Sequence, residues 1–198
     1  FIAVNHLEAH ALTARLTDKV AFPYLLLLLS GGHCQILLVL GVGDYVLLGQ
    51  TIDDAIGEAF DKVAKMLGLP YPGGPELEKL LAQADPAEAD KITLPLPLLG
   101  QKNCDFSFAG LKTAARLWIS KQTPDEVMKA HFSLAFHRTL ATILKDRLTQ
   151  ALQHPSARMA QTLVVAGGVA ANQFLCGELR AFAAAHDRTF VAPPLKLC

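Results

Sequence analysis

A run of six apolar residues, Tyr24 to Leu29, constrains the fold of this chain more than any other feature. It is far shorter than the roughly 20 apolar residues that a membrane-spanning helix needs. Ser30-Gly31-Gly32 follows at once, and this is turn chemistry that joins antiparallel strands. We therefore predict a buried strand over residues 24–29, in a protein that makes no contact with a membrane.

Further strands are expected on both sides of the chain's centre. Residues 35–42 and 45–49 would complete a three-stranded antiparallel meander. Near the other end, residues 162–166 and 189–192 have the composition of strands, and a helix is expected between them over 172–185. The chain thus begins with a meander and ends with alternating strand and helix.

Three earlier segments have helical spacing. Residues 6–16 form the first, and Asp54 as N-cap begins the second, which runs to Leu67. The second segment carries polar residues at helical spacing on one face, and that face meets either water or a ligand. A short helix is predicted near residues 76–83, within a stretch rich in proline and glycine.

A long helix is predicted from Thr123-Pro124-Asp125-Glu126, which has the pattern of a capping box with proline at the first helical position. Apolar residues recur after it at helical spacing and predict a buried stripe. The members of this stripe are Val127, Ala130, Leu134, Ala141, Leu144 and Leu148.

This order of elements is typical of an α/β chain, a mixed sheet with helices, of the actin-like or ribonuclease-H-like ATPase type. We expect one nearly complete lobe plus a remnant of the other. Residues 1–22, with Phe1–Val4 as the end of a strand, would be the remnant. Residues 23–198 would be the second lobe, with an inserted helical and loop region at about 70–122.

The balance of charge bears on possible partners. Lys and Arg together number 18, as do Asp and Glu, so the formal net charge is zero. A protein that binds nucleic acid on its own usually carries an excess of basic residues, and this chain has none. Any contact with a nucleic acid is therefore local or shared with other subunits. The cysteines have neither zinc-ribbon nor redox-pair spacing and are expected to be reduced thiols; they are Cys34, Cys104, Cys176 and Cys198.

His6 and His10 lie one helical turn apart, so both imidazoles can reach a single metal ion. The alternative is a pair of surface histidines. In zinc proteases a glutamate follows the first histidine directly, but Leu7 holds that position here. Glu8 lies about 200° around the helix from His6 and cannot act as the base of that enzyme class.

Two glycine turns have the chemistry of anion-binding loops. In Ser30-Gly31-Gly32-His33, backbone N–H groups can approach a phosphate or carboxylate closely. In residues 166–172, a buried strand runs through Gly167-Gly168 into a helix N-terminus, a natural place for a phosphate or a nucleotide edge. Each also has a purely structural explanation, as a hairpin turn or as close packing.

Two further segments are unusual in composition. Tyr71-Pro72-Gly73-Gly74-Pro75 reads either as a tight surface turn or as a lid that lies flat on a ligand. Residues 105–113 combine aromatic, hydroxyl and ammonium groups in what reads as a loop, either functional or a hydrophobic anchor with a solvated Lys112.

The combination of these motifs resembles one family, the threonylcarbamoyladenosine synthase catalytic subunit of bacteria and mitochondria, called TsaD in bacteria and formerly described as an O-sialoglycoprotein endopeptidase. The resemblance covers the whole chain. It rests on the order His-x-x-x-His, Ser-Gly-Gly-His, Asp53 to Lys62, Tyr-Pro-Gly-Gly-Pro, Phe-Ser-Phe-x-Gly-Leu-Lys and Ala-Gly-Gly-Val-x-x-Asn.

The resemblance implies a set of site residues. His6 and His10 would hold one divalent metal ion, iron or zinc, together with an aspartate of a Thr-Asp-Asn motif that follows a cysteine. The substrate and its nucleotide would contact Leu28, Leu29, Ser30, Gly31, Gly32, Asp61, Gly74 and Asn172. The general base is not identified, and Glu8 and His33 are the candidates.

The activity implied is transfer of the threonylcarbamoyl group from threonylcarbamoyl-AMP to the exocyclic amine of the adenosine next to the anticodon, in tRNAs that read codons beginning with A. AMP is released. The implied partners are tRNA, a paralogous actin-like subunit and a small ATPase, and the implied location is the cytoplasm, or the mitochondrion in a eukaryote.

We expect these 198 residues alone to bind metal weakly and to be inactive, because the third ligand and much of the first lobe are absent from them. Two rival functions remain. One is a metallopeptidase, against which the position of Leu7 argues. The other is a non-catalytic paralogue acting as a scaffold, against which the histidine pair argues.

Overall fold

Strand β1 (Tyr24–Leu29) is the middle strand of a five-stranded sheet in a computed structural model, which describes residues 5–194. The sheet order is β3-β2-β1-β4-β5. β2 (Cys34–Gly41) and β3 (Asp44–Gln50) continue antiparallel from β1, whereas β4 (Thr162–Ala166) and β5 (Thr189–Val191) add on in parallel. The predicted meander and the two later strands are confirmed.

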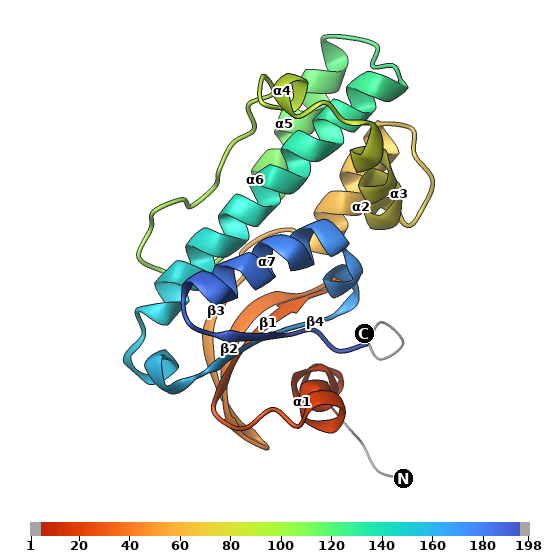
Figure 1. Cartoon of the computed structure of the whole chain (residues 1–198). Helices are drawn as coiled ribbons and strands as arrows, with labels where there is room; N and C mark the ends of the chain where they lie inside the picture. The colour runs from red at the N-terminus through yellow and green to blue at the C-terminus, as the bar shows by residue number, and fades with distance from the viewer. Residues whose placement is uncertain (1–4, 195–198) are drawn as a thin grey trace.

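All six side chains of β1 are buried, because both faces of the sheet are covered. Leu25, Leu27 and Leu29 belong to the larger hydrophobic core, with residues of α2, α5, α6 and α7. Tyr24, Leu26 and Leu28 belong to a second core on the opposite face, with residues of α1. Figure 1 shows α6 and α7 on one side of the sheet and α1 on the other.

The larger core is formed by helices of the middle and the end of the chain. They are α2 (Ile56–Met66), α3 (Gly73–Leu80), α5 (Ala109–Ser120), α6 (Glu126–Leu152) and α7 (Gln173–Ala185). Short turns of helix connect them: η1 (Leu81–Gln83), α4 (Pro86–Ala89), η2 (Pro155–Met159) and η3 (Gly168–Ala171). No helix within residues 5–194 is both long enough and apolar enough to cross a bilayer.

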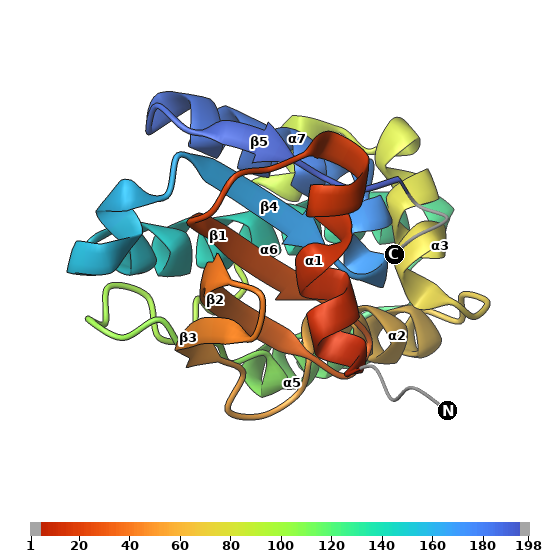
Figure 2. The ribbon, with the colours of Figure 1, turned by 90° about the horizontal axis from the view of Figure 1, so that it is seen from below.

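Helix α1 (His6–Asp18) lies across β1 and β4, as Figure 2 shows. Two small residues, Ala11 and Ala14, are buried against the sheet, and the Tyr24 hydroxyl donates a hydrogen bond to the Ala11 carbonyl oxygen at 2.6 Å. Leu16 is 85% exposed. The helix expected in the remnant of another lobe therefore docks on the sheet of the described lobe, mainly through alanines. Residues 1–4, expected to end a strand, lie outside the described range.

The cap of α2 differs from the prediction. Ala55, not Asp54, is the N-cap residue, and Glu58 reaches back to the Ala55 N–H at 3.4 Å. Asp54 instead forms an ion pair with Lys62 at 2.7 Å. An ionic partner almost two turns into the helix thus competes with capping for this carboxylate.

The prediction for the start of α6 was also wrong. Asp125 is the N-cap residue, and its carboxylate accepts the Met128 N–H at 2.8 Å. The helix therefore starts after Thr123 and Pro124. Val127 is 52% exposed and does not belong to the buried stripe, whose other five predicted members are buried.

Two segments predicted to be turns or loops contain helix starts. Gly73 begins α3, so Tyr71–Pro75 leads into a helix and is not a free-standing turn. Ala109 begins α5, so Lys112 lies on a helix. Both helices begin without a side-chain cap from their own N-cap residue, so the local signal for a helix start is absent.

Candidate functional site

The parallel pairing of β1 with β4 places two glycine turns side by side. Leu28 pairs with Ala166, so both strands run to the same edge of the sheet, and the carboxyl ends of neighbouring parallel strands are where α/β proteins bind ligands. Gly167 follows β4 with a φ of 93°, and a Cβ there would lie 2.3 Å from the carbonyl oxygen of Leu29. Only glycine permits this approach of one turn to the other strand.

The N-terminus of α2 packs on the turn after β1. The N–H of Gly57 donates to the carbonyl oxygen of Ser30 at 3.2 Å. A Cβ at Gly57 would lie 2.8 Å from both the Ser30 oxygen and the Gly31 Cα. The missing side chain thus allows the helix to sit against the turn, and one turn further on the helix carries Asp61.

Asp61 connects α2 to the first turn of α3. Its Oδ1 accepts the backbone N–H of Gly73 at 2.8 Å. This bond satisfies one of the N–H groups that every helix leaves unpaired at its start. Gly74, the next residue, lines the same cavity as Asp61.

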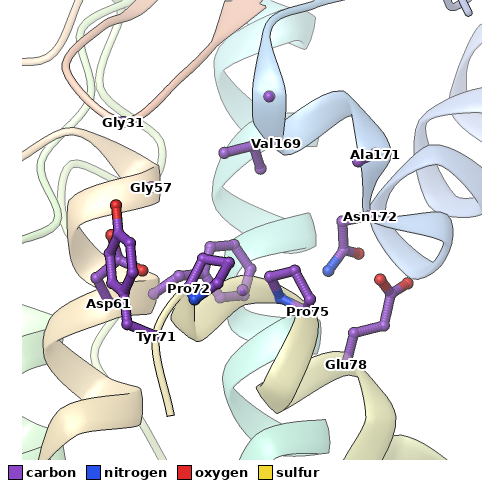
Figure 3. Close-up of a pocket in the computed structure, with 13 residues that line it drawn as sticks. Gly31, Gly57, Asp61, Tyr71, Pro72, Pro75, Glu78, Val169, Ala171 and Asn172 are labelled. Atoms are coloured by element: carbon purple, nitrogen blue, oxygen red, sulfur yellow. The ribbon is translucent and has the colours of Figure 1, made fainter. Parts of the chain in front are cut away.

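A cleft of about 350 Å³ lies among these elements, as Figure 3 shows. This volume is within the range of small-molecule sites, which begins at about 300 Å³. The predicted residues Gly31, Asp61, Gly74 and Asn172 all line it, with Gly168 from the second turn. The expected convergence of distant segments is confirmed as geometry. The other lining residues are Gly57, Phe60, Tyr71, Pro72, Pro75, Glu78, Val169 and Ala171.

The first turn of α7 is already occupied by protein acceptors. Asn172 Oδ1 accepts the Leu175 N–H at 2.9 Å. Glu78 Oε1 accepts the N–H groups of Gln173 and Phe174 at 2.6 and 3.1 Å. These three amides already have protein acceptors and are not available to a phosphate, so a role of the turn and helix start in holding a phosphate or a nucleotide edge stays a prediction.

Glu78 is a cleft residue that sequence reasoning missed. It lies on α3, 95 residues before the Gln173 amide that it binds. No local pattern marks such a contact. Its carboxylate joins the α3 wall of the cleft to the α7 wall, and Figure 3 shows it beside Asn172.

Several residues implied by the family resemblance do not line the cleft with their side chains. Leu28 and Leu29 are fully buried in the two cores, so only their backbone can meet a ligand. The Ser30 hydroxyl accepts the His33 N–H at 2.9 Å and shapes the turn. Gly32 is exposed but is not among the lining residues.

His6 and His10 lie on the same side of α1, as the sequence predicts. Their ring centroids are 4.7 Å apart in an edge-to-face arrangement. Burial lowers the pKa of His10, and the neighbouring His6 and His33 lower it further. The neutral ring is the form that binds a metal ion, so the pair fits the role of two metal ligands.

Neither histidine of the pair is among the residues that line the cleft. Within residues 5–194, no group of three or more His, Cys, Asp or Glu side chains is placed to hold a metal ion. Structural and catalytic zinc sites use at least three protein ligands. These residues therefore offer part of a metal site.

The two candidates for a general base also lie outside the cleft. Glu8 Oε1 accepts the Tyr45 hydroxyl proton at 2.8 Å, and both residues line a second cavity of about 310 Å³ between α1 and the β2–β3 hairpin. Burial raises the pKa of Tyr45, and the Glu8 carboxylate raises it further. His33 is exposed in the turn after β1. A catalytic role for either residue stays a prediction.

Comparison with known proteins identifies close relatives over the whole chain. The family described as TsaD, tRNA N6-adenosine threonylcarbamoyltransferase, matches residues 1–198. The tRNA N6-adenosine threonylcarbamoyltransferase of Bartonella tribocorum is 53% identical over 210 residues, covering 100% of this chain and 56% of the relative. That of Paramagnetospirillum magneticum is 54% identical over 202 residues, covering 100% of this chain and 57% of the relative. The chain thus spans little more than half the length of these proteins.

Two solved structures share the fold. Component A of (R)-2-hydroxyglutaryl-CoA dehydratase from Acidaminococcus fermentans has a TM-score of 0.55 and 17% identity, covering 96% of this chain and 61% of that chain. The activator of 2-hydroxyisocaproyl-CoA dehydratase from Clostridium difficile, with bound ADPNP, has a TM-score of 0.56 and 12% identity, covering 98% and 62%. At this identity the likeness concerns the fold alone, which is of the actin-like ATPase type, as predicted.

Proposed function

Because the chain belongs to the TsaD family of tRNA N6-adenosine threonylcarbamoyltransferases, we propose that it is part of an enzyme that transfers the threonylcarbamoyl group from threonylcarbamoyl-AMP to the exocyclic amine of an adenosine in tRNA. In this proposal the acceptor is the adenosine next to the anticodon, in tRNAs that read codons beginning with A. The single observation that supports it best is the convergence of four sequence-distant segments on the cleft.

The cleft offers suitable groups for the AMP half of the substrate. Gly31 lines the cleft, and Gly32 follows it in the same turn without lining the cleft itself. The N–H groups of both have no acceptor within the described part of the chain, and we assign them to the acyl-phosphate oxygens. The Asp61 carboxylate has a second oxygen beyond the one bound to Gly73, and we assign it to the ribose hydroxyls. Asn172 would contact the adenine side.

The proposed reaction is an acyl transfer. The adenosine amine attacks the carbamoyl carbon, a C–N bond forms, and the C–O bond to the phosphate breaks. AMP leaves with the bonding electrons, and the amine loses a proton. The role of the cleft is to hold the AMP moiety still, so that the carbamoyl carbon stays in position for attack.

His6 and His10 are the residues that would hold a divalent metal ion, iron or zinc, together with a ligand from outside the described range. Such an ion, when bound, polarises and orients the threonylcarbamoyl group. The contribution of the chain itself is the spacing of the two rings on one face of α1 and the lowered pKa of His10.

The proposed partners follow from charge as well as from the family. With 18 basic and 18 acidic residues, the chain has no basic excess for holding tRNA alone. We therefore assign part of the tRNA contact to other subunits, a paralogous actin-like protein and a small ATPase. We place the enzyme in the cytoplasm.

Titration of the purified chain with AMP, followed by calorimetry, tests the nucleotide assignment. Asp61→Asn keeps an oxygen for the Gly73 amide but removes the charge, so we expect AMP affinity to fall at least about 10-fold. The matched control is Asp44→Asn, on an exposed residue of β3 away from the cleft. Absence of AMP binding by the unaltered chain would contradict the assignment.

A transfer assay tests the activity. It contains threonylcarbamoyl-AMP, tRNA, metal and the partner subunits, with the Bartonella tribocorum relative as positive control. We expect modified tRNA from the relative and none from these 198 residues alone. Product formed by the chain alone would show that the described lobe suffices, whereas peptide cleavage without tRNA modification would favour the metallopeptidase alternative.

A further inference from the structure

A buried hydrogen-bond chain runs from the middle of α6 to the cleft. His137 is fully buried, and its Nδ1 lies 2.8 Å from the carbonyl oxygen of Ser133. Its Nε2 lies 3.0 Å from Nδ2 of Asn172, which lines the cleft. None of the sequence motifs points to this histidine.

The partners of the ring fix its tautomer. A carbonyl oxygen can only accept, so Nδ1 carries the proton and donates it to Ser133. In the neutral ring Nε2 then has a lone pair and accepts. Burial lowers the pKa of His137 to about 4, so the neutral ring is the form present at physiological pH.

The tautomer in turn fixes the amide of Asn172. Only the NH₂ group can face an accepting Nε2, and Oδ1 then faces the Leu175 N–H, which donates to it at 2.9 Å. The hydrogen bonds at both ends of the amide therefore require the same orientation. A flipped amide would put two acceptors together at His137 and two donors together at Leu175.

The same turn of α6 also holds the opposite wall of the cleft. The Ser133 hydroxyl donates to the carbonyl oxygen of Leu77 on α3 at 2.6 Å, and it is fully buried. Gly74 lies on the same helix, one turn earlier. The Ser133–His137 turn therefore touches both α3 and Asn172.

We propose that His137 is a positioning residue for nucleotide recognition, which holds the Asn172 amide in one orientation so that an Nδ2 hydrogen is presented to an acceptor atom of the bound adenine nucleotide. The inference rests on the proposed function of the cleft. Phe60 and Phe174 enclose the ring at centroid distances of 5.2 and 5.6 Å and prevent it from turning away.

The test compares three variants of the chain by AMP titration. In His137→Leu the Asn172 amide loses its acceptor, and we expect AMP affinity to fall about 10-fold. In His137→Gln the side-chain oxygen can replace Nε2, and we expect affinity within about 3-fold of the unaltered chain. His131→Leu, on the same helix and outside the cleft, is the matched control and should not alter affinity.

Two further readouts separate positioning from a merely structural role. In an Asn172→Ala background, His137→Leu should no longer change AMP affinity, because the group that it positions is gone. Nitrogen-15 NMR of the His137 ring should show the Nδ1–H tautomer. Equal losses in both backgrounds, the other tautomer, or full affinity in His137→Leu would each overturn the inference.

Failure of the inference differs from failure of the proposed function. If the unaltered chain binds AMP and Asp61→Asn lowers the AMP affinity, the cleft is a nucleotide site whatever the role of His137. If the unaltered chain binds no AMP, the proposed function fails and this inference fails with it.

Discussion

The carboxylate of Asp53 accepts the backbone N–H of Phe108 at 2.8 Å, across 55 residues of sequence. It also accepts the Ser107 hydroxyl proton at 2.5 Å and the Ala109 N–H at 3.3 Å. Asp53 thus caps α5 from outside that helix. It joins two motifs that appear unrelated in the sequence, the segment before α2 and the segment before α5.

Replacing Asp53 with alanine should destabilise the fold, because the N–H groups at the start of α5 lose their acceptor. We expect a loss of about 1–2 kcal/mol in the free energy of unfolding, the usual cost of a lost helix cap. Urea denaturation measures it. Asp44→Ala, an exposed aspartate with no such contact, is the control, and an equal effect of both substitutions would argue against the cap.

Two neighbouring glycines should respond very differently to alanine. A Cβ at Gly167 would meet the Leu29 oxygen at 2.3 Å, and its φ of 93° is unfavourable for alanine, whereas a Cβ at Gly168 would meet nothing within 4 Å. We expect Gly167→Ala to cost at least about 2 kcal/mol and Gly168→Ala less than about 0.5 kcal/mol. Thermal unfolding of the pair checks this, and similar melting temperatures would contradict the close approach of the two turns.

Gly31 offers a test of the cleft that leaves the fold intact. A Cβ there would contact no protein atom within 4 Å, yet the residue lines the cleft. We expect Gly31→Val to leave the melting temperature nearly unchanged and to lower AMP affinity about 10-fold or more, by occupying ligand space. Gly177→Val, on the exposed side of α7, is the control for a glycine outside the cleft.

The strands and the cleft could be predicted from the sequence because their signals are local. The apolar run of β1 and the glycine turns after β1 and β4 carry the information within a few residues. Parallel pairing of the two strands then brings the turns together. Glu78 and His137 could not be found in this way, since each acts on a partner at least 35 residues away and neither lies in a motif.

The predictions of where helices start failed for a related reason. Asp54 has the chemistry of an N-cap, but Lys62 lies close enough to take its carboxylate. Helix α5 has its cap from Asp53, which no local pattern reveals. A local ion pair outweighs the capping preference of Asp54, and a tertiary contact supplies the cap of α5.

The histidine pair should bind zinc weakly, and both rings should be needed. We expect His6→Ala and His10→Ala each to abolish specific zinc binding by the chain, because one imidazole alone does not form a site. Calorimetry with zinc ions is the measurement, and His154→Ala, at an exposed histidine in the bend after α6, is the control. Unchanged zinc affinity in both variants would refute the metal assignment without reference to catalysis.

The free energy of unfolding should fall in acid because the buried His137 ring resists protonation in the fold. Its pKa is about 4 in the fold, against about 6.5 for an unfolded histidine. Between these values the unfolded chain binds a proton that the folded chain does not, so the contribution is fully present above about pH 6.5 and is lost as the pH falls toward 4. The difference in pKa corresponds to at most about 3 kcal/mol.

Carboxylates also titrate in this range, so the measurement is a difference. The free energy of unfolding in urea is compared between the unaltered chain and His137→Gln at pH 7, 5.5 and 4.5. Glutamine keeps an acceptor for Asn172 but does not titrate, so its stability should decline less steeply with acid, and the two curves should converge toward low pH. Curves that stay parallel from pH 7 to 4.5 would mean that the ring is protonated equally in both states. The inference that a neutral His137 ring orients Asn172 would then be contradicted.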